Sequence, residues 1–301
     1  MTEAVVVVQR VQKAYASVEA VKDLSLEVQR GEIFGLLGPN GAGKTTMIRI
    51  LMDIIKPDAG IVRVFGQAPG AARDRVGYLP EERGLYRNLR VDECLTYLGQ
   101  LKGMTRLAAQ QRALDLLARV ELSEWAKKKV QDLSRGMQQK VQLIASLLHS
   151  PNLVVLDEPF QGLDPVNAEM VREIIRDLRA QSVTVVLSAH EMSQVEALCD
   201  RIVLIDHGRA VLDGVLADLK RQFAPNALEI SPPLPLDGWP EVERTETNQQ
   251  SQTVFLRPSA TPRDLLRKIF EAGLAVDRFQ TATATLEQIF IAVVKEGHHH
   301  A

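Results

Sequence analysis

The sequence predicts an α/β fold: a mostly parallel sheet, interrupted by a helical insertion and followed by a small α+β domain. Three observations predict it. A glycine-rich loop at 38–46 separates an apolar run from a helical pattern. Near-continuous apolar runs return at 153–156, 183–187 and 202–205, and a helical pattern at 166–180 separates the first two. Such runs, alternating with helices, are typical of strands buried on both faces of a parallel sheet.

The glycine-rich loop reads Gly-Pro-Asn-Gly-Ala-Gly-Lys-Thr-Thr, which is a complete G-x-x-x-x-G-K-[ST] pattern. An expected strand at 33–37 precedes it and an expected helix at 47–55 follows, which is the context that the pattern requires. Glycines let backbone N–H groups turn inward around phosphates, and the helix adds the positive end of its dipole. We therefore expect a nucleoside triphosphate to bind here. The expected nucleotide-binding residues of the loop are Gly38, Pro39, Asn40, Gly41, Ala42, Gly43, Lys44, Thr45 and Thr46.

Two side chains of this loop have predicted roles. Lys44 is expected to reach the β- and γ-phosphates and to face solvent before nucleotide arrives, and the Thr45 hydroxyl is expected to ligate magnesium. The alternative is a glycine-rich turn that meets the pattern by chance, and the flanking strand and helix argue against it.

The remaining elements follow in order. Strands are expected at 5–9 and 25–28 before the loop and at 61–66 after it. From about residue 91 to 148 the apolar residues recur at helical spacing. The first domain is thus predicted to span residues 1–222, with a helical insertion at about 85–150.

The composition changes near Phe223, where the segment 231–240 is rich in proline and glycine. We expect a small α+β domain at 223–301. Within it the pattern predicts a strand, a helix, a second strand and a closing helix, at 253–257, 262–272, 274–279 and 285–294.

Bulk properties exclude several classes of protein. The net charge of the 301-residue chain is −2, so no global basic field indicates nucleic acid as a partner. The N-terminus lacks the features of a signal peptide, and the apolar runs are far shorter than the ~20 residues that cross a bilayer. Cys94 and Cys199 cannot form a disulfide framework, which fits a reducing cytosol. The run His298–His300 is either a native tail or part of a tag, and it does not enter the fold prediction.

The apolar run at 153–156 ends in two acids, Asp157 and Glu158. A buried strand thus delivers carboxylates to the C-terminal edge of the sheet, where such sheets bind ligands. Asp157 is expected to hold magnesium, and Glu158 is expected to polarise the attacking water. The alternative is a strand that ends in a solvated acidic turn, which the phosphate loop disfavours.

The segment Leu-Ser-Arg-Gly-Met-Gln-Gln-Lys at 133–140 begins a further helix. Ser134 is a good N-cap, and Val141, Ile144 and Leu148 follow at helical spacing. These residues by themselves leave open whether the segment is only an ordinary capped helix.

Taken together, residues 1–220 resemble the ATP-binding subunits of ABC transporters, which have a P-loop NTPase (RecA-like) core with a helical insertion. The resemblance implies that 133–137 is the signature motif, usually Leu-Ser-Gly-Gly-Gln, which caps the γ-phosphate held by the opposite subunit. It adds four residues to the nucleotide-binding set, of which Ser134 and Gly136 match the motif, whereas Arg135 and Met137 depart from it.

The resemblance assigns three more residues. Tyr15 matches the aromatic residue that stacks on adenine, and His190 matches the switch histidine that touches the γ-phosphate. Glu81 stands where the family usually has a glutamine that binds the metal. The segment 162–164 matches the loop that crosses the dimer interface. The implied catalytic residues are Lys44, Glu158 and His190, and the implied metal ligands are Thr45, Glu81 and Asp157.

The segments 79–86 and 133–140, together with the C-terminal domain, resemble ATPases of bacterial type-2 ABC exporters of the sodium-efflux and drug-export group. The resemblance implies an ATPase that uses ATP and Mg²⁺ and works as a head-to-tail homodimer or heterodimer. It also implies a transmembrane permease that docks beside 81–90, a cytoplasmic place on the inner face of the membrane, and a regulatory or dimerising C-terminal domain. It does not give the transported substrate.

Two alternatives remain. A soluble ABC ATPase that acts on DNA or ribosomes would need a long coiled coil or a second cassette, but only 90 positions separate Lys44 from Ser134, and one phosphate loop is present. An importer ATPase is the second alternative, and the C-terminal domain lacks the look of the OB-type domain that would favour it.

Overall fold

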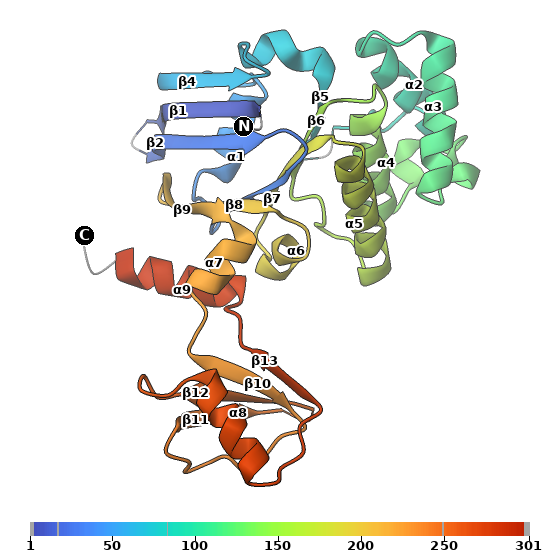
Figure 1. Ribbon diagram of the computed structural model, residues 1–301. Helices are drawn as coiled ribbons and strands as arrows, with labels where there is room; N and C mark the ends of the chain where they lie inside the picture. Colours follow the sequence, from blue (N-terminus) through green and yellow to red (C-terminus); the bar gives the residue numbers. More distant parts are fainter. Residues whose placement is uncertain (1–2, 17, 83, 249, 298–301) are drawn as a thin grey trace. The chain divides into compact units, whose positions relative to one another are not determined.

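The computed structural model describes residues 3–16, 18–82, 84–248 and 250–297. Residues 294–297 are described by their backbone alone. Two compact units make up the chain, shown in Figure 1. The larger holds residues 1–216 and 293–301, and the smaller holds 217–292. The run His298–His300 lies outside the described residues.

A six-stranded sheet, ordered β5-β6-β7-β3-β8-β9, is the centre of the larger unit. Neighbouring strands are parallel except for β9, which runs antiparallel to β8. Every residue of β3, β6 and β7 is buried, as the apolar runs predict. The strands are β3 (Ile33–Leu37), β5 (Val76–Leu79), β6 (Leu153–Asp157), β7 (Thr184–Ala189), β8 (Arg201–Asp206) and β9 (Arg209–Val215).

A second, antiparallel sheet packs with helix α1 (Lys44–Leu51) against one face of the first. Val8, Phe34 and Ile48 represent the two sheets and the helix in their shared core. Gly35 faces the opposite side, where an added Cβ would lie 3.0 Å from the sulfur of Cys199. The strands of this sheet are ordered β2-β1-β4 and are β1 (Ala4–Tyr15), β2 (Val18–Gln29) and β4 (Ala59–Val64).

The helical insertion contains α2, α3 and α4, which group beside β5 (Figure 1). Side chains of Thr105, Ser134 and Asp164 accept hydrogen bonds from backbone N–H groups three residues on, and so start α3, α4 and α5. The helices of the insertion are α2 (Val91–Leu101), α3 (Arg106–Arg119) and α4 (Arg135–Leu147). After the insertion come α5 (Pro165–Ala180), α6 (Met192–Glu196) and α7 (Leu216–Gln222). Short 3₁₀ turns are η1 (Pro69–Arg75), η2 (Ser123–Trp125) and η3 (Val130–Asp132).

The smaller unit contains a four-stranded antiparallel sheet ordered β11-β12-β10-β13. Leu265 and Ile269 of α8 (Pro262–Glu271) enter the core of this sheet. Thr261 caps α8, and its capping box with Asp264 explains where the helix begins. The strands are β10 (Ala227–Ser231), β11 (Val242–Thr247), β12 (Gln252–Leu256) and β13 (Arg278–Thr281). The boundary between the units falls within two helices, α7 after Leu216 and α9 (Leu286–Gly297) after Ala292.

The strand expected at 274–279 is wrong over most of its length, because β13 starts only at Arg278. Leu274 and Val276 pack on the core of the smaller unit from outside the sheet. They are apolar because they are partly buried, and not because they pair in a strand. The helix expected at 47–55 ends at Leu51. None of the helices in the described part of the chain is long and apolar enough to cross a membrane.

Candidate active site

The glycine-rich loop connects β3 to α1, as the sequence predicts. Gly38 and Gly43 have φ angles of 146° and 109°, which side chains rarely adopt. A Cβ on Gly38 would lie 2.1 Å from the Ile205 carbonyl oxygen, and one on Gly43 would lie 2.2 Å from that of Ala20. Both positions therefore require glycine for space as well as for conformation.

A polar cavity of about 310 Å³ lies at this loop. Elements that are distant in the sequence contribute to its wall, so the fold brings together the phosphate loop, one expected metal ligand from the segment after β5 and one expected catalytic acid from the end of β6. Its lining residues are Ala20, Asn40, Gly41, Gly43, Lys44, Thr45, Thr46, Glu81 and Glu158.

Lys44 does not face solvent, which corrects the expectation from the sequence. It is only 7% exposed, because its ammonium group folds back and donates to the carbonyl oxygens of Gly38 at 2.7 Å and Pro39 at 3.0 Å. Burial lowers the pKa of Lys44, and the nearby charge of Glu158 opposes this shift. A phosphate group that enters the loop therefore has to displace these two carbonyl contacts.

Asp157, the last residue of β6, is 1% exposed. The parallel pairing of β6 with β7 sets Asp157 beside Ser188, whose hydroxyl donates to Asp157 Oδ1 at 2.6 Å. Asp157 Oδ2 is buried and has no hydrogen-bond partner among the described residues. Burial raises the pKa of Asp157, and the charge of Glu81 adds to the shift.

Glu158 and His190 are in direct contact. His190 Nδ1 lies 2.8 Å from Glu158 Oε2, a hydrogen bond in which the carboxylate accepts. Glu158 has a φ of 52°, and its backbone N–H donates to Ser188 Oγ at 3.1 Å. Non-glycine residues in this left-handed region gather at functional sites. Two of the three expected catalytic residues thus form a pair, and Ser188, which the sequence analysis missed, supports both acids.

The expected metal ligands fit a magnesium ion that arrives with a nucleotide. Within the described part of the chain, a buried carboxylate oxygen of Asp157 lacks a donor, and Thr45 and Glu81 line the adjoining cavity. All three supply oxygen, which Mg²⁺ prefers. Among the described residues, no group of three or more His, Cys, Asp or Glu side chains can hold a metal by itself. The phosphates of the nucleotide would therefore have to complete the coordination.

The expected signature segment lies elsewhere in the larger unit. Ser134 is the N-cap of α4, with its hydroxyl accepting from Met137 N at 3.3 Å, as the sequence predicts. A Cβ on Gly136 would lie 3.6 Å from the Leu163 side chain, so this segment adjoins the loop at 162–164. Neither these residues nor Arg135 belong to the described lining of the cavity at the phosphate loop.

Tyr15 also stays apart from that lining. It ends β1 with 44% of its surface exposed, and Lys13 Nζ lies 5.8 Å from the centre of its ring. An exposed aromatic face is what base stacking needs.

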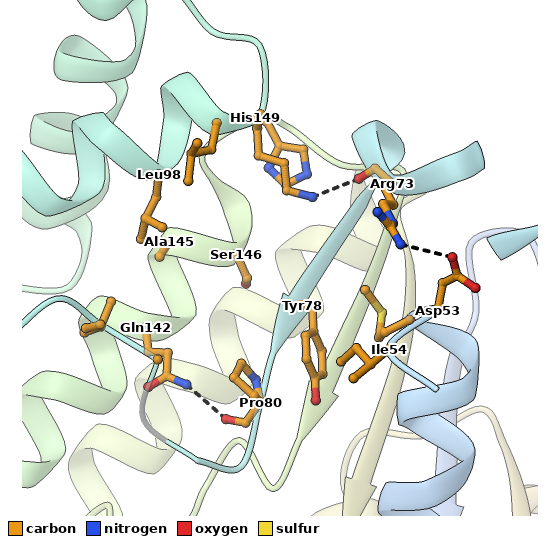
Figure 2. A pocket seen from close by; sticks show the side chains of 15 residues that line it. Asp53, Ile54, Arg73, Tyr78, Pro80, Leu98, Gln142, Ala145, Ser146 and His149 are labelled. Carbon is orange, nitrogen blue, oxygen red and sulfur yellow. Dashed lines mark hydrogen bonds and ion pairs between the residues drawn. The ribbon is translucent and has the colours of Figure 1, made fainter. Parts of the chain in front are cut away.

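A larger cavity of about 520 Å³ lies between the helical insertion and β5 (Figure 2). Apolar side chains make up much of its wall, and burial raises the pKa of Tyr78 there to about 12. Burial lowers the pKa of Lys102 and of His149 in the same wall. The lining residues are Met52, Asp53, Ile54, Arg73, Tyr78, Pro80, Gly84, Leu85, Leu98, Leu101, Lys102, Gln142, Ala145, Ser146 and His149.

The geometry defines the class of protein first. A parallel sheet with a phosphate loop after β3, two acids at the end of β6 and a histidine after β7 is the arrangement of a P-loop nucleoside triphosphatase.

Comparisons with known proteins then give the family. The ABC transporter family model matches residues 21–161, and the model for the C-terminal domain of DrrA1-3-like ATP-binding proteins matches 214–294. An uncharacterised ABC transporter ATP-binding protein of Methanocaldococcus jannaschii is 42% identical over 72% of this chain and 80% of its own length. The Nod factor export ATP-binding protein I of Paraburkholderia xenovorans is 35% identical over 97% of both chains.

A solved structure agrees with these relatives. An ATP-binding cassette in a dimeric, post-hydrolysis state with ADP and phosphate matches with a TM-score of 0.66 and 25% identity, over 70% of this chain and 98% of the other. The chain belongs to the ATP-binding subunits of ABC transporters, and it is an ATPase.

Proposed function

We propose that this chain hydrolyses ATP to power an ABC exporter, and that two chains share each ATP in a head-to-tail dimer. The observation that carries the proposal is the split of the expected site. Lys44, Glu158 and Glu81 line one cavity, whereas Ser134 and Gly136 begin α4 outside it. A second chain has to supply the signature segment, as the similarity to a dimeric cassette supports.

Each expected site residue of this chain has a role that follows from its chemistry. The loop from Gly38 to Thr46 supplies backbone N–H groups to the phosphates, and Lys44 exchanges its two carbonyl contacts for phosphate oxygens. Glu158 accepts a proton from the attacking water, and His190 contacts the γ-phosphate. Tyr15 stacks on adenine.

The metal ion would be held by Thr45, Asp157 and Glu81 together with the phosphates. When bound, Mg²⁺ neutralises charge that develops on the phosphate oxygens. Ser188 keeps Asp157 oriented through the hydroxyl that donates to Oδ1.

From the opposite chain, Ser134 presents a hydroxyl and Arg135, Gly136 and Met137 present the start of α4. The first turn of α4 carries no acidic residue, so its backbone N–H groups and dipole favour the γ-phosphate.

The permease is proposed to dock in the larger cavity, because a wall with much apolar surface suits a helix of another protein. The chain is accordingly proposed to lie on the cytoplasmic face of a membrane. Export is proposed from the similarity to the Nod factor export protein over the whole chain and from the matched C-terminal domain. We assign the ATPase domain to 1–222, with its insertion at about 85–150, and a dimerising or regulatory domain to 223–301.

Glu158→Gln tests this proposal. The amide keeps the shape of the side chain but accepts no proton, so hydrolysis should fall by about 100-fold or more while ATP still binds. The variant should be a monomer without nucleotide and a dimer with Mg²⁺-ATP in size-exclusion chromatography with light scattering. Adding Ser134→Arg puts bulk and charge into the shared site and should restore the monomer.

Two results would contradict the proposal. Undiminished hydrolysis by Glu158→Gln removes Glu158 from the role of general base. A Glu158→Gln protein that remains monomeric at saturating ATP, both alone and with its permease, overturns the shared site.

A further inference from the structure

Gln142 of α4 makes an unusual pair of contacts. It is 4% exposed, and its Nε2 group donates to the carbonyl oxygens of Pro80 and Glu82, each at 3.0 Å. A primary amide carries two N–H donors, so one side chain can make both bonds. Figure 2 shows the bond between Gln142 and Pro80.

The two accepting carbonyl groups flank Glu81. This residue lies beyond Leu79, where β5 ends, so the ladder of the sheet no longer holds it. It lines the nucleotide cavity, and its charge acts on both Lys44 and Asp157. The position of Glu81 in the site therefore depends on what holds the carbonyl groups before and after it.

We infer that Gln142 is a positioning residue that fixes Glu81 in the nucleotide cavity and ties it to the wall of the larger cavity. The role of Glu81 in binding Mg²⁺-ATP rests on the proposed function. Residues that orient a metal ligand from behind typically change metal affinity or activity by about 10- to 100-fold when they are lost.

Gln142 also lines the larger cavity. Its Oε1 atom is buried, and it has no hydrogen-bond partner in the described part of the chain. The same wall also holds the start of β5, because Lys102 Nζ and His149 Nε2 each lie 3.1 Å from the Val76 carbonyl oxygen. Side chains of the larger cavity thus hold the segment 76–82 at both of its ends, and a segment docked there contacts the groups that position Glu81.

The first test is hydrogen exchange in Gln142→Met, which keeps the length of the side chain but removes its donors. The peptide that covers 76–82 should exchange at least about fivefold faster in nucleotide-free protein, because exchange reports local opening. Unchanged exchange of this peptide overturns the inference, whatever the role of Glu81 in binding.

The second test is a double-mutant cycle with Glu81→Ala, read as the affinity for a fluorescent ATP analogue with Mg²⁺. Gln142→Met should weaken binding about tenfold when Glu81 is present and less than about twofold when it is absent, because the two residues act in one chain of contacts. Equal effects in both backgrounds mean that Gln142 acts only on stability, which contradicts the inference.

Gln138 provides the matched control. It is also a buried glutamine of α4, and its Nε2 donates to two carbonyl oxygens, those of Val130 at 3.2 Å and Leu133 at 3.0 Å. Gln138→Met loses the same kind of bonds, but it should leave exchange of 76–82 unchanged and add to Glu81→Ala without coupling. Should Gln142→Met fail to fold, Gln142→Asn keeps the amide on a shorter side chain that cannot reach both carbonyls. A native protein that does not bind ATP would refute the proposed function, and the exchange result would still decide the role of Gln142.

Discussion

The nucleotide cavity and the larger cavity each contain a buried lysine, and the two lysines make similar contacts. Lys44 donates to the carbonyl oxygens of Gly38 and Pro39, and Lys102 donates to those of Arg73 at 2.8 Å and Val76 at 3.1 Å. Burial lowers the pKa of both. Their surroundings differ, because the carboxylates of Glu158, Asp157 and Glu81 act on Lys44, whereas Asp74 and Arg73 act on Lys102.

This difference in surroundings distinguishes the nucleotide cavity, which suits a charged ligand, from the larger cavity, which suits an apolar one. In the nucleotide cavity, the charged groups surround open space at a loop whose backbone N–H groups can donate to an anion. In the larger cavity, Lys102, Gln142 and His149 each contact a backbone carbonyl oxygen. Apolar side chains such as Leu98 and Leu101 remain to contact a ligand. The same residue type is therefore proposed to serve catalysis in the nucleotide cavity, whereas in the larger cavity it holds backbone carbonyl groups.

The largest effect is expected from the two lysines themselves. Lys44→Ala should weaken ATP binding by about 100-fold or more, since charge-assisted bonds to phosphates are among the strongest that a site makes. Lys102→Met should lower the free energy of unfolding but change ATP affinity by less than about threefold. Nucleotide titration measures both, with circular dichroism as the check of folding. Equal losses of ATP affinity in Lys44→Ala and Lys102→Met would contradict the different roles of the two cavities.

A charge placed in the larger cavity should break docking but not nucleotide binding. Ala145→Arg buries a cation in the apolar wall and should reduce the amount of chain recovered with the native membrane fraction by at least about tenfold. Leu107→Arg adds the same charge on α3, where the side chain is 78% exposed, and should have little effect. ATP affinity of both variants should equal that of the native chain. Equal membrane recovery for the two variants would remove this cavity from the proposed docking site.

Two buried serines sharpen the comparison further. Ser188→Ala removes the donor to Asp157 Oδ1, so hydrolysis should fall about fivefold and the free energy of unfolding by about 1–3 kcal/mol. Ser146 lines the larger cavity and donates to the Leu143 carbonyl oxygen of its own helix, at 2.6 Å. Ser146→Ala should leave the rate of hydrolysis unchanged. Steady-state ATPase assays and chemical denaturation give the two quantities, and normal hydrolysis by Ser188→Ala would contradict the support of Asp157.

The smallest expected effects are pH-dependent changes in stability, of opposite sign for Asp157, beside the nucleotide cavity, and Asp53, in the wall of the larger cavity. Because burial raises the pKa of Asp157, its ionised form destabilises the folded protein above that pKa. Asp157→Asn should therefore raise the melting temperature of the metal-free, nucleotide-free protein near pH 7, even though it removes an expected magnesium ligand. The gain should shrink as the pH falls through the raised pKa of Asp157 and should vanish below about 3.9, the ordinary pKa of an aspartate, because Asp157 is then protonated in both states.

Asp53, in the wall of the larger cavity, should behave in the opposite way. A hydrogen bond from Lys56 lowers the pKa of Asp53, so its ionised form stabilises the folded protein above the unfolded pKa. Asp53→Asn should lower the melting temperature near neutral pH, and the difference should vanish as the pH falls through the lowered pKa. Thermal unfolding at a series of pH values measures both variants, and shifts of the same sign would show that burial does not govern Asp157.

The prediction from sequence worked where local pattern and burial agree. The run at 33–37 is β3, and Ser134 is the N-cap of α4, because an apolar strand and a capped helix are both specified by neighbouring residues. It failed where apolar residues are buried without pairing in a strand. Leu274 and Val276 are apolar because they cover the core of the smaller unit, and not because they pair in its sheet.

The sequence by itself determined the phosphate loop, the acids that end β6, the helical insertion and the family, because each depends on residue types at short and fixed spacing. Only the tertiary structure decided that Lys44 is curled into its own loop, that Ser188 supports Asp157, and that Gln142 holds the backbone on both sides of Glu81. Gln142 and Glu82 are 60 positions apart in the chain. Contacts over such separations depend on strand register and helix packing, which no local pattern of residues specifies.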